Sequence, residues 1–227
     1  MKDTAFWRDR WKTAYKNAAF YQSDKNTEEY WDSMAQTDGG GLYGDEHIRL
    51  LVNYLFSEKL IDKHSTVLDV GCGSGGYVSS LAGYCRHITA LDHSAKMLDL
   101  CRTRCEKEGL FNISYKLADY RDIVFNKRFD CILACLNPST YDPDVLDKML
   151  SETTKTVVYF SMDTDINDAD AEPVYCGCNS VRFAEAYLRE REIRYSKIPY
   201  VYTFVTDNKE VREVRFAYLV IDKGILG

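Results

Sequence analysis

The sequence predicts an α/β fold in which a mostly parallel sheet carries helices on both faces and ends in an antiparallel strand. Apolar runs typical of buried strands alternate with helical periodicity from residue 65 onward, which is the pattern of a parallel sheet with crossover helices. The chain ends in two β-rich runs joined by a short polar turn. Seven runs are expected to be strands: 66–70, 87–91, 112–117, 129–135, 155–161, 198–206 and 211–221.

The segments between these runs predict the crossover helices. Ser94 and Asp142 are expected to cap two of them, because their side chains can accept hydrogen bonds from free amides of the first turn. The polar turn at 207–209 makes the last two runs a hairpin, so the final strand must run antiparallel to its neighbour. Residues 118–128 carry only a weak helical signal. The expected helices are 75–84, 94–108, 142–151 and 179–193.

The first 64 residues contain no strand pattern and predict a helical attachment to the sheet. Trp11 and Tyr15 fall close to one helical face, and residues 45–60 form a second amphipathic helix. Three glycines at 39–41 mark a flexible break between the two helices. The expected organisation is an N-terminal helical cap over residues 1–43 and one larger ligand-binding domain over residues 44–227.

Composition and charge bound the class of function. No apolar run in the 227 residues approaches the length of about 18 that a membrane helix needs, and the N-terminus lacks the apolar core of a secretory signal. The net charge of -6 disfavours a large nucleic-acid surface. Eight scattered cysteines without a signal sequence predict reduced thiols. We expect a cytoplasmic monomer or homodimer that contacts neither membrane nor nucleic acid.

The stretch VLDVGCGSGG, residues 67–76, predicts a ligand-binding loop between a strand and a helix. Glycines let a ligand approach the backbone, and the start of the following helix offers free amides. Asp92 lies about twenty residues after the loop, where a carboxylate can accept hydrogen bonds from ribose hydroxyls. This spacing fits a dinucleotide as well as another adenosine ligand.

Three features together resemble the class I S-adenosylmethionine-dependent methyltransferases. They are LDVGCGSG with Asp69 two residues before the first glycine, ALDHSAKML at 90–98, and the terminal hairpin. The resemblance covers roughly residues 44–221 and is nearest to the UbiE/type 11-like small-molecule enzymes. It implies a Rossmann-like seven-stranded fold, S-adenosyl-L-methionine as cofactor with S-adenosyl-L-homocysteine as product, and a small-molecule acceptor with an N, O or S nucleophile.

The resemblance also implies the roles of individual residues in holding the cofactor. Asp69 would support the glycine loop or the cofactor's amino group, and Asp92 would accept both ribose hydroxyls. His93 and Met97 would flank the adenine. The other expected cofactor-binding residues are Gly71, Cys72, Gly73 and Gly75 in the loop, Asp119 and Tyr120 at the adenine amino group, and Leu136 near the methyl group. Structural alternatives are a turn cap for Asp69 or Asp119 and a core position for Met97.

The acceptor side is less defined by the sequence. CLNPSTY at 135–141 follows the fourth expected strand, yet it departs from the Asn-Pro-Pro-Tyr motif of nucleic-acid amino methyltransferases, and Pro138 alone could set a turn there. Aromatic residues before residue 44 could cover the cofactor or only attach the cap to the core. Candidate catalytic residues are Asn137, Tyr141, Tyr15 and Tyr21; related aromatic cap positions are Phe20, Trp31 and Tyr43.

Two other features suggest alternatives. Cys176 and Cys178 could hold a metalloid acceptor, although no C-x-x-C pair occurs and no bound metal is expected. The loop at 162–173 has five acids and no base, which could select a cationic acceptor or be merely solvated. Rival functions are methylation of RNA or protein, an NAD-dependent oxidoreductase, and a cofactor-binding protein without catalysis.

Overall fold

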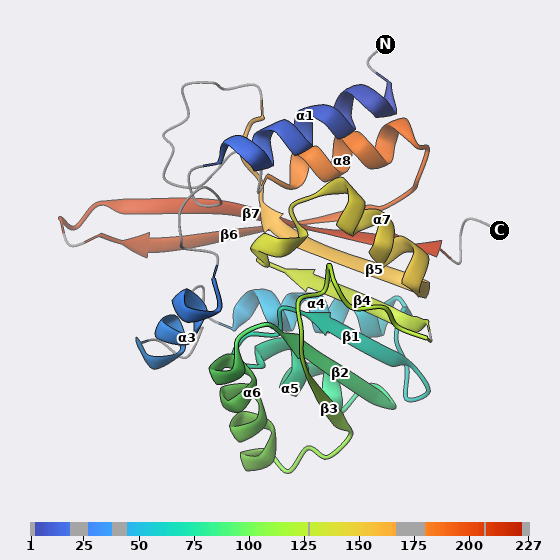
Figure 1. Cartoon of the computed structure of the whole chain (residues 1–227). Coiled ribbons are helices and arrows are strands. Elements are labelled where there is room, and N and C mark those ends of the chain that lie inside the picture. The colour runs from blue at the N-terminus through green and yellow to red at the C-terminus, as the bar shows by residue number, and fades with distance from the viewer. Residues whose placement is uncertain are drawn as a thin grey trace.

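The computed structural model describes residues 3–18, 27–37, 45–126, 128–166, 180–206 and 208–223. Its centre is a seven-stranded sheet in the order β3-β2-β1-β4-β5-β7-β6 (Figure 1). β7 runs antiparallel to both β5 and β6, and the neighbouring strands from β3 to β5 are parallel. The predicted fold class is confirmed. The strands are β1 (Thr66–Val70), β2 (His87–Asp92), β3 (Ile113–Leu117), β4 (Phe129–Cys135), β5 (Thr153–Met162), β6 (Ser196–Val205) and β7 (Val211–Asp222).

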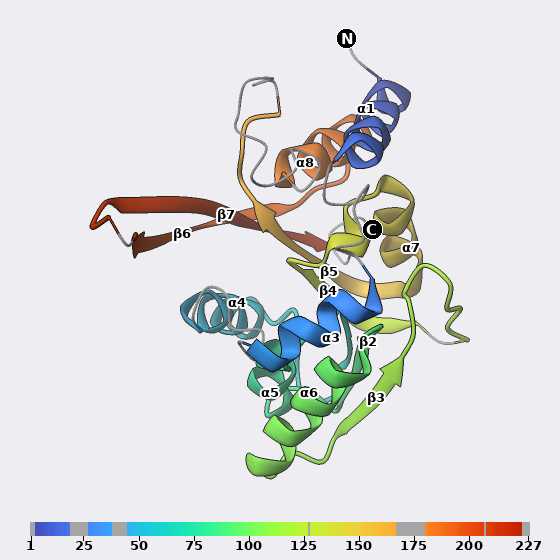
Figure 2. The same cartoon turned by 60° about the vertical axis from the view of Figure 1, so that its left-hand side comes forward.

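Helices cover both faces of the sheet (Figure 2). One layer holds α4 (Glu46–Ser57), α5 (Gly76–Ala82) and α6 (Ala95–Lys107), and the other holds α1 (Thr4–Asn17), α7 (Pro143–Glu152) and α8 (Val181–Glu190). Ser94 and Asp142 cap α6 and α7 as predicted, each accepting a hydrogen bond from an amide of the first turn. Within the described residues, no helix combines the length and the apolar character that crossing a bilayer requires.

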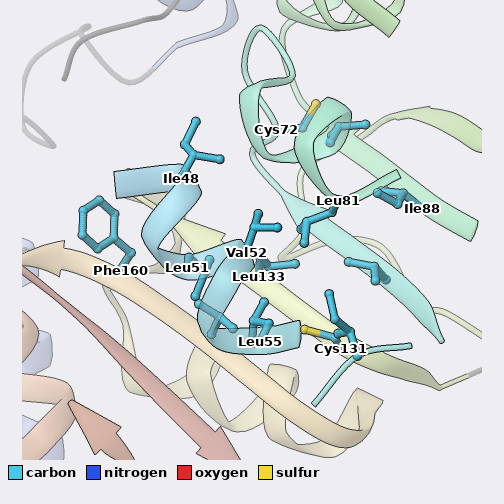
Figure 3. Packing of buried hydrophobic residues seen from close by; sticks show 14 of the residues in the cluster. Ile48, Leu51, Val52, Leu55, Cys72, Leu81, Ile88, Cys131, Leu133 and Phe160 are labelled. Carbon is cyan, nitrogen blue, oxygen red and sulfur yellow. The ribbon is translucent and has the colours of Figure 1, made fainter. Parts of the chain in front are cut away.

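Each face of the parallel strands is buried against its own helical layer. On the α4 side, Leu51 and Leu55 pack with Leu81 of α5 and with Leu133 and Cys131 of β4 (Figure 3). Burial raises the pKa of the Cys131 thiol, so this thiol stays protonated and behaves as a small apolar side chain. The cysteines in the described part of the chain are free thiols.

The two N-terminal helices take different positions. α1 packs against α7 and α8, and its fully buried Trp11 stacks on Phe183 with ring centroids 6.2 Å apart. α3 (Glu28–Thr37) instead packs against α6. The predicted boundary after residue 43, the glycines at 39–41 and the aromatic residues Phe20, Tyr21 and Tyr43 lie outside the described residues. The cap domain therefore stays a prediction.

Trp11→Ala should lower the free energy of unfolding by about 3–5 kcal/mol, because it removes a large buried ring and leaves a cavity. Trp11 is fully buried, with Tyr159 and Tyr187 also packed edge-on against its ring. Phe6→Ala on the same helix is the matched control, since Phe6 is 38% exposed. Urea unfolding followed by circular dichroism measures both. Equal effects of the two substitutions would contradict the burial of Trp11.

Candidate active site

A cavity opens at the carboxyl ends of β1, β2 and β4. In the order of the sheet, β1 and β4 are neighbours from which the chain proceeds in opposite directions, and such switch points are where open α/β sheets bind ligands. The cavity wall includes residues after each of these strands and side chains from α3 and α4. Eight residues predicted to bind the cofactor or to take part in catalysis line it: Gly71, Cys72, Gly73, Asp92, His93, Met97, Leu136 and Asn137.

Asp92 connects the glycine loop to the start of α6. Its Oδ2 accepts a hydrogen bond from the Gly73 amide at 2.9 Å, and its Oδ1 accepts one from the Ser94 amide at 2.9 Å. The side chain is buried, and burial raises the pKa of the carboxyl while the two amides oppose that shift. Asp92 is therefore fixed in orientation at the cavity wall.

The three glycines at positions 71, 73 and 75 of the loop differ in what surrounds them. At Gly71, with φ of +71°, an added Cβ would lie 2.2 Å from Asn137 Nδ2. At Gly75, with φ of +86°, it would lie 2.6 Å from Cys101 Sγ. A Cβ at Gly73 would meet nothing within 4 Å in the described part of the chain. Gly71 and Gly75 thus permit close packing of the protein on itself, and Gly73 faces the open cavity.

Asn137 uses its amide to join the ends of β1 and β4. Its Nδ2 donates to the Val70 carbonyl at 2.9 Å, and its Oδ1 accepts from the Ser139 amide and hydroxyl at 3.0 and 2.9 Å. The preceding Leu136 has φ of +50°, a conformation that is rare for a residue with a side chain and is found at functional sites. These contacts orient the backbone of the segment after β4 toward the cavity.

Several predicted residues lie away from the cavity wall. Asp119 accepts hydrogen bonds from the Arg121 amide at 2.8 Å and from its guanidinium at 2.6 Å; burial alone would raise the pKa of this carboxyl, but the Arg121 contacts lower it. Tyr120 donates to Glu152 at 2.7 Å in the core on the α7 side. Gly75 packs on α6, as described above.

Two of the three tyrosine candidates for catalysis, Tyr141 and Tyr15, are also outside the cavity wall. Tyr141 is buried in the core on the α7 side, with its ring edge-on to Tyr159. Tyr15 of α1 accepts a hydrogen bond from Arg121 at 3.4 Å. Tyr21 lies outside the described residues, as do Cys176, Cys178 and most of the acidic loop. The predicted roles of the tyrosines, the two cysteines and the acidic loop stay predictions.

Residues far away in the sequence complete the cavity wall. His47 of α4 is buried, stacks on Phe160 with centroids 5.4 Å apart, and lies edge-on to Tyr77 of α5. Trp31 and Met34 of α3 form another part of the wall. The amphipathic pattern at 45–60 predicts the helix that carries His47, but the pattern alone does not show that His47 lies at a cavity. Trp31 is one of the aromatic cap positions that the sequence suggested could cover the cofactor. Wall residues that the sequence analysis did not suggest include Met34, Asp45, His47, Tyr77 and Arg104.

Comparison with known proteins identifies this arrangement. Residues 67–158 match a family model described as a methyltransferase domain. These residues therefore form a methyltransferase domain. Over 134 residues it is 28% identical to EEF1A lysine methyltransferase 2 of Homo sapiens, a match covering 54% of this chain and 56% of the relative. Over 107 residues it is 31% identical to a ubiquinone biosynthesis O-methyltransferase of Actinobacillus pleuropneumoniae serotype 7 (strain AP76), covering 44% and 42%. The matches therefore span about half the length of these curated relatives.

Solved structures share the fold of the methyltransferase domain. Magnesium protoporphyrin IX methyltransferase (ChlM) from Synechocystis PCC 6803 aligns with a TM-score of 0.58 at 12% identity, over 97% of this chain and 95% of that one. Precorrin-6y C5,15-methyltransferase from Geobacter metallireducens GS-15 gives 0.60 at 12% identity, over 82% and 92%. At this identity the likeness shows the fold alone. The predicted family is confirmed by the family match, and with it S-adenosylmethionine as the cofactor of the methyltransferase domain.

Asp69 tests whether the domain fits this cofactor. It is buried at the end of β1, and its Oδ2 has no hydrogen-bond partner among the described residues. Burial, together with the nearby charge of Asp92, raises the pKa of Asp69 to about 7. A buried acid of this kind is stabilised as a carboxylate by a cation, and S-adenosylmethionine carries both a sulfonium and an ammonium group. Asp92 lines the cavity and Asp69 is not among its wall residues, so Asp69 favours a cationic ligand through its charge and not through a contact seen in the structure.

The described residues include thiols near the cavity but no cluster of possible metal ligands. Groups of three or more His, Cys, Asp or Glu side chains that could hold a metal ion do not occur among them. Cys72 of the cavity wall is buried, and its thiol pKa is raised by its contact with Cys101 and by burial. It is therefore a protonated, apolar part of the wall.

The free energy of unfolding of the Asp69→Asn variant should increase relative to that of the wild type as the pH rises. The folded-state pKa of about 7 lies above the ordinary value, so the contribution of Asp69 to stability is present at low pH and is lost as the pH rises from about 4 to about 7. Asparagine does not titrate. In urea unfolding without cofactor, the free energy of unfolding of the variant minus that of the wild type should therefore increase between about pH 5 and about pH 7.5. Asp99→Asn, an exposed acid paired with Arg102, is the control. If the stability of the variant relative to the wild type decreased over this range, the raised pKa of Asp69 in the folded protein would be contradicted.

Proposed function

We propose that the chain transfers the methyl group of S-adenosylmethionine to a small-molecule acceptor with an N, O or S nucleophile. The observation that carries the proposal is the pair Asp69 and Asp92, buried acids beside an open glycine loop inside a matched methyltransferase domain. The bound cofactor supplies an electrophilic methyl group on a positive sulfur. Methyl transfer is then an in-line displacement, which depends mainly on alignment and on exclusion of water.

The proposed contacts follow the cavity wall. Asp92 would accept hydrogen bonds from the ribose hydroxyls, as the amides already hold its carboxylate in place. The buried side chain of Met97 and the neighbouring His93 would contact the adenine. Gly73 leaves the space through which the cofactor approaches the backbone. Asp119 and Tyr120 would contribute through the backbone rather than through their engaged side chains.

The acceptor would enter on the side formed by α4 and the segment after β4. His47, Tyr77, Cys135 and Leu136 line this part of the wall. The Tyr77 and Tyr218 hydroxyls lie 2.7 Å apart, and Tyr218 donates to the His47 carbonyl at 2.9 Å, so α5, β7 and α4 are held together. The imidazole of His47 can accept a proton, which is needed only when the acceptor is protonated at the working pH.

A lysine side chain of a protein is the second candidate acceptor. The observation in its favour is the 134-residue similarity to EEF1A lysine methyltransferase 2, at 28% identity. A lysine must lose a proton before it can accept a methyl group, and a histidine in the cavity wall suits that need. The O- and N-methyltransferases among the relatives support a small-molecule acceptor, which we retain as the main proposal.

Asp92→Asn should weaken binding of S-adenosylhomocysteine by about 1.5–3 kcal/mol, because it removes charge-assisted hydrogen bonds to the ribose. Isothermal titration calorimetry measures the affinity. Asp99→Asn is the charge-matched control on α6, where its exposed side chain pairs with Arg102. Unchanged affinity in Asp92→Asn would mean that another residue holds the ribose. Binding of NAD but not of S-adenosylmethionine to the wild type would overturn the proposed function.

The acceptor is identified by a transfer assay with methyl-labelled S-adenosylmethionine. The screen covers amines, thiols, phenols and metalloid oxyanions, with a lysine-rich protein extract and tRNA as polymer arms. A labelled small molecule supports the main proposal. Label confined to protein would replace it with the lysine acceptor, and label in tRNA would contradict both. The His47→Gln variant should then lose rate mainly with acceptors that must release a proton.

A further inference from the structure

The helix α3 is joined to the start of α6 by one carboxylate. Asp32 Oδ1 accepts a hydrogen bond from the Ser94 hydroxyl at 2.5 Å and one from the Lys96 amide at 3.3 Å. Its Oδ2 lies 3.7 Å from the Lys96 ammonium. These residues are more than 60 positions apart in the chain, so the contact fixes one segment of the N-terminal region against the sheet domain (Figure 2).

This contact continues into the glycine loop. The Ser94 hydroxyl that donates to Asp32 also accepts from the Met97 amide at 3.1 Å, and the Ser94 amide donates to Asp92 at 2.9 Å. The other oxygen of Asp92 accepts from Gly73. A continuous path of hydrogen bonds therefore runs from α3 to the loop beside the cavity.

The same helix supplies part of the cavity wall. Trp31 immediately precedes Asp32 and Met34 follows two residues later, and both line the cavity together with Asp92 and Met97. Because the three residues lie within one helical turn, the position of the Asp32 carboxylate fixes where Trp31 and Met34 lie relative to α6. Moving α3 away from α6 would open this side of the cavity to solvent.

The electrostatic setting suits a charged residue at this position. Hydrogen bonding by Ser94 has the largest effect and lowers the pKa of Asp32; burial opposes it, and the amide and ammonium of Lys96 lower the pKa further. The carboxylate also lies at the N-terminus of α6, where helix amides carry partial positive charge. The Asp32 side chain is 21% exposed, so it is partly shielded from screening by solvent.

We propose that Asp32 is a positioning residue for the cofactor cavity: it holds α3 on α6 so that Trp31 and Met34 close one side of the site around bound S-adenosylmethionine. Asp32 itself does not line the cavity. Its effect on affinity is exerted through the position of α3 and through the turn that carries Asp92. This inference rests on the proposed function, because it takes the cavity to be the cofactor site.

The expected size of the effect follows from the fraction of molecules with α3 in place. Apparent affinity falls in proportion to the population that is competent to bind. If loss of the carboxylate leaves about one molecule in ten with α3 docked, the apparent Kd rises about tenfold. Cofactor binding must in turn favour the docked helix, because the coupling is reciprocal.

The test compares Asp32→Ala, Asp32→Asn and Glu29→Ala in the full chain. Glu29 is an exposed acid on α3, so its loss removes the same charge from the same helix without touching α6. Calorimetry measures the Kd for S-adenosylhomocysteine, and hydrogen exchange measures protection of amides 28–37 with and without this ligand. We expect the Kd to rise about tenfold in Asp32→Ala, to be partly restored in Asp32→Asn, which keeps an oxygen acceptor for Ser94, and to be unchanged in Glu29→Ala. Ligand should protect 28–37 in the wild type.

The outcomes separate this inference from the proposed function. Failure of the wild type to bind S-adenosylhomocysteine would defeat the proposed function itself. Binding by the wild type with equal affinity in Asp32→Ala and Glu29→Ala would overturn the role of Asp32 alone. Asp32→Ser, whose hydroxyl is too short to span the gap, replaces Asp32→Ala if that variant does not fold. A raised Kd in Asp32→Ala, with no protection of amides 28–37 by the ligand in the wild type, would also overturn the inference.

Discussion

The hydrogen bonds made by Asp92 are the constraint on which the site depends. One carboxylate accepts from the Gly73 amide and from the Ser94 amide, each at 2.9 Å. It thereby fixes the loop after β1 relative to the first turn of α6, although these segments belong to different crossover units. The parallel register of β1 on β2, in which Asp69 pairs with Ala90 and Val70 with Leu91, brings the two segments to the same height. The geometry of the site therefore depends directly on the register of β1 on β2.

The second buried acid makes this arrangement unfavourable for the ligand-free protein. Asp69 and Asp92 are both buried, and the charge of Asp92 raises the cost of ionising Asp69. Replacing Asp69 by an apolar residue would remove that cost, together with the cost of a buried oxygen that has no partner among the described residues. Keeping such a group is understandable when a cationic ligand is to be bound. The fully packed helical layers on both faces provide the stability against which this local cost is set.

The sequence could predict the features that are encoded locally, and it could not predict the direction of individual side chains. Strand and helix periodicities gave element positions within a few residues, and the pattern around Asp69 and Asp92 gave the family and its cofactor. Tyr120 follows the expected strand closely, yet its ring points into the core on the α7 side and reaches Glu152. His47 lies on the helix predicted at 45–60, whereas Trp31 lies on α3, a helix that was not predicted from the sequence. The place of both residues over the cavity depends on tertiary packing.

The segment after β4 shows why the acceptor is harder to predict than the cofactor. An asparagine followed by proline suggests an amide that orients the acceptor, but here both ends of the Asn137 amide are used within the protein, by Val70 and by Ser139. The steric need for glycine at position 71 is a consequence of the same amide, which lies against it. This asparagine thus shapes the backbone at Leu136 and leaves acceptor recognition to other groups. Under the proposed function, other residues of the cavity wall, such as His47 of α4, would then contact the acceptor.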